Sequence, residues 1–131
     1  MAQHLNLGKE GEDITVKHLV KHGYKILERN YRKKWGEIDV IAESFDKTRN
    51  KKILHFIEVK SVSYETDFEN LIPEANVHFH KKQRLEKTIK TYLAEKNISE
   101  NTEFQIDVFA ILVDSETREN KIRITENIIF E

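Results

Sequence analysis

The chain has 131 residues, of which 38% are hydrophobic and 34% are charged, and its net charge is −1. This length fits one domain with a single core, and the near-neutral charge argues against a general polyanion-binding protein, which would be strongly basic. The sequence contains no cysteine, which excludes disulfides and thiolate metal sites. We find no segment typical of a signal peptide or a membrane span, and therefore expect a cytoplasmic protein without a membrane partner, folded as one domain over residues 1–131.

The beginning of the chain predicts an amphipathic helix over residues 9–22, with a C-terminal stop at Gly23. The apolar stripe of this helix consists of Val16, Leu19 and Val20. Glu12 lies at helical spacing from this stripe, which places a carboxylate on the face that should meet the core. An acid in the first turn is favoured by the helix dipole, but the dipole does not explain its position on the apolar face.

Strands are predicted after this helix over residues 24–30, 37–42 and 53–62. We expect the polar residues 43–52 to connect the last two strands as a hairpin. The strand over 53–62 is apolar on both faces at its start, which predicts a central position in the sheet. The remaining elements expected are a loop over 63–79, a helix over 81–96 and strands over 104–113, 121–125 and 127–130. Helices before and after a cluster of strands indicate an α/β or α+β sandwich.

Charged side chains interrupt the most apolar of these strands. Glu58 and Lys60 are two residues apart and therefore share one face of their strand. If the hairpin turn is centred near residues 47–49, the residue numbers of two opposed residues add up to about 97. Asp39 then faces Glu58. In the same register Glu37 would face Lys60. Two opposed carboxylates repel each other by roughly 3 kcal/mol, and a divalent cation between them reverses that sign. Hard oxygen ligands in small number suit Mg²⁺ or Mn²⁺.

Each of these features also has a structural interpretation. Glu58 and Lys60 could form an ion-pair ladder at the rim of the sheet, and for Asp107, in another apolar strand, we favour a structural role. Two basic clusters could contact phosphates or could be solvated surface. The clusters are Arg29, Arg32, Lys33 and Lys34 beside Trp35, and Lys81, Lys82, Arg84, Lys87 and Lys90 on the second predicted helix.

A set of motifs in order along the chain resembles the bacterial YraN-like family, which is placed in the PD-(D/E)XK nuclease superfamily. The motifs are Gly8-x-x-Gly11-Glu12, Gly23-Tyr24-x-Ile26-Leu27-x-x-Asn30, Gly36-Glu37-Ile38-Asp39-Val40-Ile41 and Ile57-Glu58-Val59-Lys60. Weaker similarity continues through Glu74-Ala75, Lys81-x-x-x-Leu85, Tyr92-Leu93 and Asp107-Val108. The resemblance implies a single nuclease-like domain of the α/β class with a restriction-endonuclease-like core, in which helices flank a central mixed sheet.

The resemblance also implies roles for individual residues. Asp39 and Glu58 would bind Mg²⁺ or Mn²⁺, with the backbone carbonyl of Val59 as a further ligand. Lys60 would position or activate the attacking water, and Glu12 would complete the acidic cluster as in Holliday-junction-resolvase-like proteins. The expected nucleic-acid contacts are Lys81, Lys82, Arg84, Arg32, Lys33 and Lys34.

The activity implied is metal-dependent hydrolysis of nucleic-acid phosphodiesters, with DNA as the favoured partner. The alternative is a nucleic-acid- or protein-binding module on the same fold with weak or no catalysis. The near-neutral charge favours this alternative, as does Val62, which stands where many relatives have Arg. A third interpretation, a purely structural domain, predicts no metal binding. Superfamily members often dimerise, which leaves a homodimer open.

Overall fold

The computed structural model describes residues 7–63, 79–114, 116–117 and 119–128. Its elements, in chain order, are α1 (Leu7–Lys21), β1 (Lys25–Lys33), β2 (Gly36–Asp46), β3 (Lys51–Ser63), α2 (Phe79–Glu95), β4 (Glu103–Val113) and β5 (Asn120–Thr125). Within these ranges, neither helix is long and apolar enough to cross a bilayer. The predicted loop over 63–79 lies almost entirely outside the described residues.

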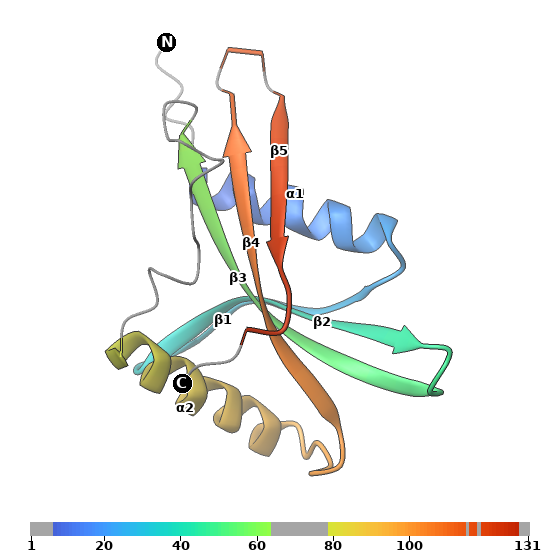
Figure 1. Cartoon of the computed structure of the whole chain (residues 1–131). Coiled ribbons are helices and arrows are strands. Elements are labelled where there is room, and N and C mark those ends of the chain that lie inside the picture. Colours follow the sequence, from blue (N-terminus) through green and yellow to red (C-terminus); the bar gives the residue numbers. More distant parts are fainter. Residues whose placement is uncertain (1–6, 64–78, 115, 118, 129–131) are drawn as a thin grey trace.

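The five strands form one mixed sheet in the order β1-β2-β3-β4-β5. The pairs β1–β2, β2–β3 and β4–β5 are antiparallel, whereas β3 and β4 are parallel. A parallel pair needs a crossover connection, and α2 lies in the segment that joins β3 to β4. The predicted α/β class, with helices flanking a central mixed sheet, is confirmed. The central position predicted for β3 is confirmed as well (Figure 1).

The two helices cover opposite faces of the sheet (Figure 1), and each face has its own apolar core. The core under α2 consists of Tyr31, Ile38, Ile41, Leu54, Phe56, Leu85, Ile89 and Tyr92. The core under α1 consists of Leu19, Val40, Ala42, Ile57, Phe109, Ile111 and Val113. Strands buried on both faces read as continuous apolar runs, which is why β3 and β4 were recognisable from the sequence.

The hairpin between β2 and β3 is tighter than the sequence suggested. We expected residues 43–52 to be a connection, but β2 continues to Asp46 and β3 begins at Lys51. The Asp46 carboxylate accepts hydrogen bonds from the backbone N–H groups of Thr48 and Arg49, at 3.0 and 3.3 Å, and Asn50 adopts a positive φ of 53°. These contacts let a short turn close an exposed two-stranded ribbon whose polar side chains hide its strand character.

The buried stripe of α1 differs from the predicted one. Val20 is 56% exposed, whereas Thr15 and Leu19 are buried at 0% and 1%. Gly11 is also buried, and a Cβ there would lie 2.0 Å from Oγ of Ser61, so the helix touches β3 at this point. The residues buried against the sheet are four apart along the helix, namely Gly11, Thr15 and Leu19, so only Leu19 of the predicted stripe is fully buried.

The predicted stop of the first helix at Gly23 is confirmed. Gly23 has a φ of +86°, and the N–H of Tyr24 donates to the carbonyl of Leu19 at 3.0 Å. This is the bonding of a Schellman C-cap, which requires the left-handed conformation that glycine adopts without strain.

The prediction of a strand over residues 127–130 is wrong for residues 127–128, the part of this segment that the structure describes. β5 ends at Thr125, and Asn127 turns away with a φ of 53°. The reason is a side-chain acceptor, because the N–H of Asn127 donates to Oδ1 of Asp107 at 2.9 Å. The backbone group that a strand ladder would use is therefore bound by a buried carboxylate.

Candidate functional site

The candidate site begins where β2 and β3 stop pairing. Their antiparallel ladder runs from Asp46–Lys51 to Val40–Ile57, in the register that the turn position predicted. Asp39 and Glu58 are the next residues beyond the last pair. The Val59 N–H, which has no β2 carbonyl opposite it in this ladder, donates to Oδ2 of Asp39 at 2.7 Å. The side chain of Asp39 thus closes the end of the ladder.

Asp39 is held in an environment that disfavours its charge. Burial is the main cause, and it raises the pKa of Asp39 to about 6 although the Val59 hydrogen bond acts in the opposite direction. The carboxylates of Glu12, Glu58 and Glu37 raise this pKa further. Residues from three elements therefore bring negative charge to one half-buried carboxyl group.

Glu12 reaches this cluster from α1. Its side chain is only 14% exposed, and Nη2 of Arg29 on β1 lies 3.8 Å from it. Arg29 binds Asp13 more closely, at 2.6 Å, so Glu12 is only partly neutralised. The close contact of Gly11 with Ser61 fixes how deeply this turn of the helix approaches β3.

Glu58, Val59 and Lys60 follow one another on β3, all half-buried. Glu58 lies on the face that carries Leu54 and Phe56, as predicted, and this is the face covered by α2. Lys60 lies two residues further along the same face and is paired with Ala110 of β4. Glu37, which we expected opposite Lys60, instead binds Nε of Arg32 at 2.9 Å through Oε2, because the β2–β3 ladder ends before it.

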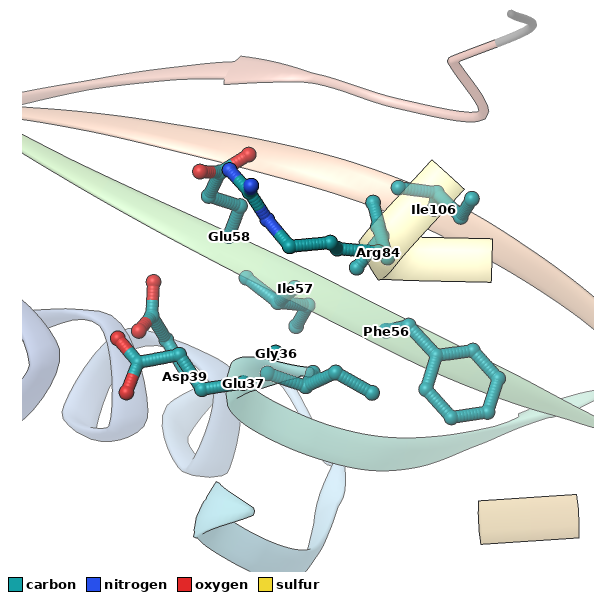
Figure 2. A pocket seen from close by; sticks show the side chains of 10 residues that line it. Gly36, Glu37, Asp39, Phe56, Ile57, Glu58, Arg84 and Ile106 are labelled. Carbon is teal, nitrogen blue, oxygen red and sulfur yellow. The ribbon is translucent and has the colours of Figure 1, made fainter. Parts of the chain in front are cut away.

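A cavity of about 220 Å³ opens beside these residues, between the sheet and α2. It is lined by Gly36, Glu37, Ile38, Asp39, Phe56, Ile57, Glu58, Arg84, Leu85 and Ile106. Figure 2 shows the carboxylates of Glu37 and Asp39 on the β2 side, Glu58 on the β3 side, and Arg84 extending from α2 along the cavity. The cavity therefore has an apolar floor, an acidic side and one cationic side chain.

The structure separates the expected nucleic-acid contacts into two groups. Arg32 and Lys33 are bound by carboxylates, with Glu37 at 2.9 Å and Glu95 at 2.6 Å. Lys34 and Arg84 are exposed, and Arg84 reaches the cavity. Lys82 is half-buried on α2, and the side chain of Lys81 lies outside the described part of the chain.

Within the described ranges, no three His, Cys, Asp or Glu side chains are grouped closely enough to hold a metal ion by themselves. The oxygen donors at the end of the ladder are Asp39, Glu58 and the backbone carbonyl of Val59. Their chemistry fits a hard divalent cation, because carboxylate and carbonyl oxygens are the ligands of Mg²⁺ and Mn²⁺. The raised pKa of Asp39, caused by burial and by neighbouring carboxylates, indicates negative charge that a cation would offset.

A second polar cluster was only partly visible in the sequence. Asp107 is 2% exposed and accepts hydrogen bonds from His55 at 2.8 Å, Gln105 at 2.9 Å and the N–H of Asn127. Burial opposes ionisation of Asp107, but these hydrogen bonds outweigh it and lower its pKa. His55 Nε2 lies 2.7 Å from Oγ of Ser44. The structural role that we favoured for Asp107 agrees with these bonds, whereas His55, 52 residues away, gave no signal.

Comparison with known sequences places this geometry in a family. The profile described as "Uncharacterised protein family UPF0102" matches residues 11–111. The chain belongs to the UPF0102 family. The expected resemblance to YraN-like proteins is confirmed at this level, and the match includes Glu12, Asp39, Glu58 and Arg84.

UPF0102 proteins of several bacteria are similar to this chain over most of their length. One from Campylobacter hominis is 41% identical over 123 residues, covering 92% of this chain and 91% of the relative. One from Campylobacter lari is 36% identical and covers 99% and 98%. One from Thermotoga maritima is 40% identical over 90 residues, covering 69% of this chain and 73% of the relative. These names state a family and no activity.

Proposed function

We propose that this UPF0102 protein is a metal-dependent nuclease of the PD-(D/E)XK superfamily that hydrolyses nucleic-acid phosphodiesters, with DNA as the favoured substrate. The observation that carries the proposal is the half-buried Asp39 carboxyl group, with a pKa raised to about 6, set among the carboxylates of Glu12, Glu58 and Glu37. Like charges gathered on a sheet destabilise it, and perturbed carboxylates in a cavity are typical of functional sites. The α/β mixed sheet with a helix on each face agrees with a restriction-endonuclease-like core.

In this proposal each residue has a defined task. Asp39, Glu58 and the Val59 carbonyl hold Mg²⁺ or Mn²⁺, which supplies Lewis acidity toward the phosphate when bound. Lys60 offsets the negative charge that grows on the phosphate oxygens as water attacks phosphorus. Glu12 orients that water from the α1 side. The P–O ester bond breaks, leaving a phosphomonoester and a hydroxyl group.

Calorimetric titration of Mn²⁺ tests the metal site without a guess about the substrate. We expect one saturable site in the wild type that is lost in Asp39→Ala and in Glu58→Ala. Asp46→Ala is the matched control, because Asp46 lies on the same strand but in the hairpin turn. Binding that survives Asp39→Ala unchanged would refute the assignment of the ligands.

Cleavage of branched, single-stranded and duplex DNA then tests the chemistry. We expect Lys60→Ala to bind Mn²⁺ normally and to lose activity on the order of a hundredfold, the effect of removing one group that stabilises transition-state charge. Full activity in Lys60→Ala would show that its role is wrong.

The second candidate function is a binding module with weak or no turnover. Two observations favour it, the net charge of −1 and the neutralisation of Arg32 and Lys33 by Glu37 and Glu95. It predicts binding of a nucleic acid or of a protein partner without Mn²⁺-dependent cleavage. Clustered carboxylates would repel phosphates in a pure binding protein, and for that reason we rank it second.

A further inference from the structure

Among the cations near the candidate site, two classes differ in a way that the sequence does not show. Those of β1 are neutralised, since Arg29 binds Asp13 at 2.6 Å, and Arg32 and Lys33 are held by carboxylates as described above. Such pairs must be broken before a phosphate can use them. Breaking an exposed pair costs only about 0–1 kcal/mol, but the carboxylate of each pair stays close by and repels a phosphate, so a phosphate gains less from these side chains than from unpaired cations.

The second class consists of Lys34, Arg84 and Lys87. All three are exposed, and no carboxylate among the described residues forms an ion pair with any of them. Lys34 lies in the turn between β1 and β2, whereas Arg84 and Lys87 lie one helical turn apart on α2. These charges are available to an anionic ligand.

Close packing joins the turn and the helix into one surface. A Cβ on Gly36 would lie 2.6 Å from Oγ1 of Thr88 and 3.2 Å from the carbonyl oxygen of Arg84. A glycine is therefore needed for the turn to approach α2 this closely. Lys34 and Trp35, which precede Gly36, are held beside the helix for the same reason, and Gly36 itself lines the cavity with Asp39 and Glu58.

Trp35 is the aromatic member of this surface and the only tryptophan of the chain. It is half-buried, and Nζ of Lys87 lies 4.6 Å above its ring centroid. Its Nε1 atom is buried without a hydrogen-bond partner in the described structure. A buried indole N–H group usually has a hydrogen-bond partner, so the missing partner makes Trp35 unusual among buried aromatic side chains.

We infer that Lys34, Trp35, Arg84 and Lys87 form a track on which an unpaired nucleic-acid strand lies as it enters the Asp39–Glu58 cavity. This inference rests on the proposed function and adds the substrate class. The three cations contact successive phosphates of the strand. On binding, Lys87 moves off the Trp35 ring to contact a phosphate, and a base stacks on the ring in its place. Bases stacked inside a duplex cannot reach such a ring, whereas aromatic and cationic side chains together are typical of single-strand binding.

The single tryptophan makes this inference directly measurable. The full-length Asp39→Asn variant, in EDTA to prevent turnover, is titrated with a labelled single-stranded oligothymidylate and with the corresponding duplex. Label anisotropy reports binding, and Trp35 emission reports stacking. We expect the single strand to bind and to quench Trp35, and the duplex to quench it much less. Oligothymidylate that binds without changing Trp35 emission, equal quenching by duplex, or no binding at all overturns the inference.

Substitutions test the contributions of the α2 cations and of the Trp35 ring separately. Lys87→Ala and Arg84→Ala should each lower the salt dependence of binding by roughly 0.7 in the slope of log K against log salt, the value for one phosphate contact on a single strand. Trp35→Ala should weaken binding on the order of tenfold, and Trp35→Phe should restore most of it while preserving the fold. Arg49→Ala is the control, because this exposed arginine lies in the distant β2–β3 hairpin turn and is paired with Asp46 and with Glu103 of β4. Unchanged slopes in both α2 variants contradict the track.

Mn²⁺ calorimetry keeps this inference separate from the proposed function. If Mn²⁺ does not bind at Asp39 but single strands quench Trp35, the track stands and the nuclease proposal fails. If Mn²⁺ binds at Asp39 and Trp35 emission does not respond, the nuclease proposal stands and the track fails.

Discussion

Replacement of Asp39 by asparagine should stabilise the metal-free protein, and the gain should depend on pH. The folded pKa of Asp39 is about 6, raised from 3.8 mainly by burial and then by neighbouring carboxylates. Between these two values the folded state binds more protons than the unfolded state, so wild-type stability falls as pH rises through this window. A shift of about two units corresponds to about 3 kcal/mol, which the Asp39→Asn variant would not lose because the amide side chain carries no charge.

Urea denaturation in EDTA at several pH values measures this effect. We expect the unfolding free energies of wild type and Asp39→Asn to be close near pH 4 and to diverge up to pH 7, where the variant should be more stable by about 3 kcal/mol at most. Asp46→Asn should show the opposite sign, because hydrogen bonds from Arg49 lower the pKa of Asp46. If the difference in unfolding free energy between wild type and Asp39→Asn stays constant from pH 4 to 8, burial and neighbouring carboxylates do not destabilise the charged form of Asp39, and the reasoning is refuted.

Two further substitutions test the contacts around the site. Gly11→Ala should cost about 1–3 kcal/mol by thermal unfolding, because the new Cβ would lie 2.0 Å from Oγ of Ser61, and Ser61→Ala in the same chain should recover part of the loss. No recovery in the double variant would mean that another contact limits the approach of α1. Asp107→Asn should cost about 1–3 kcal/mol at neutral pH, measured in urea, because His55 and the Asn127 N–H lose a charged acceptor. The folded pKa of Asp107 is lowered, so this cost should shrink as the pH falls through that pKa, and a cost that grows instead would contradict the assignment.

Much of the β2–β3 region was accessible from the sequence because its signals are local. One turn position sets the register of an antiparallel hairpin, and that register places Asp39 next to Glu58. Charges that break an alternating apolar pattern are conspicuous, which is how the candidate carboxylates were found. The extent of the hairpin was missed because most side chains at its exposed end are polar, and Phe45 alone does not create an alternating pattern.

Contacts between distant parts of the chain could not be read in this way. Lys33 and Glu95 are 62 residues apart, so nothing in the basic cluster of β1 shows that it is neutralised. The stripe of α1 was misjudged for a related reason, since Gly11 and Thr15 are buried by the close approach of β3 and not by their own hydrophobicity. Helical periodicity identifies a face only when apolar side chains mark it.

The residues of the candidate site come from α1, β2, β3 and α2, and they are spread along the chain from Glu12 to Arg84. The three strands β1, β2 and β3 are joined by short turns and can pair early, whereas docking of the two helices closes long loops and is entropically slower. A nascent chain would therefore carry Asp39 and Glu58 on a formed hairpin before α2 has left the ribosome and can dock. Under the proposed function, the cavity that receives the substrate would be complete only after α2 has emerged and docked on the sheet.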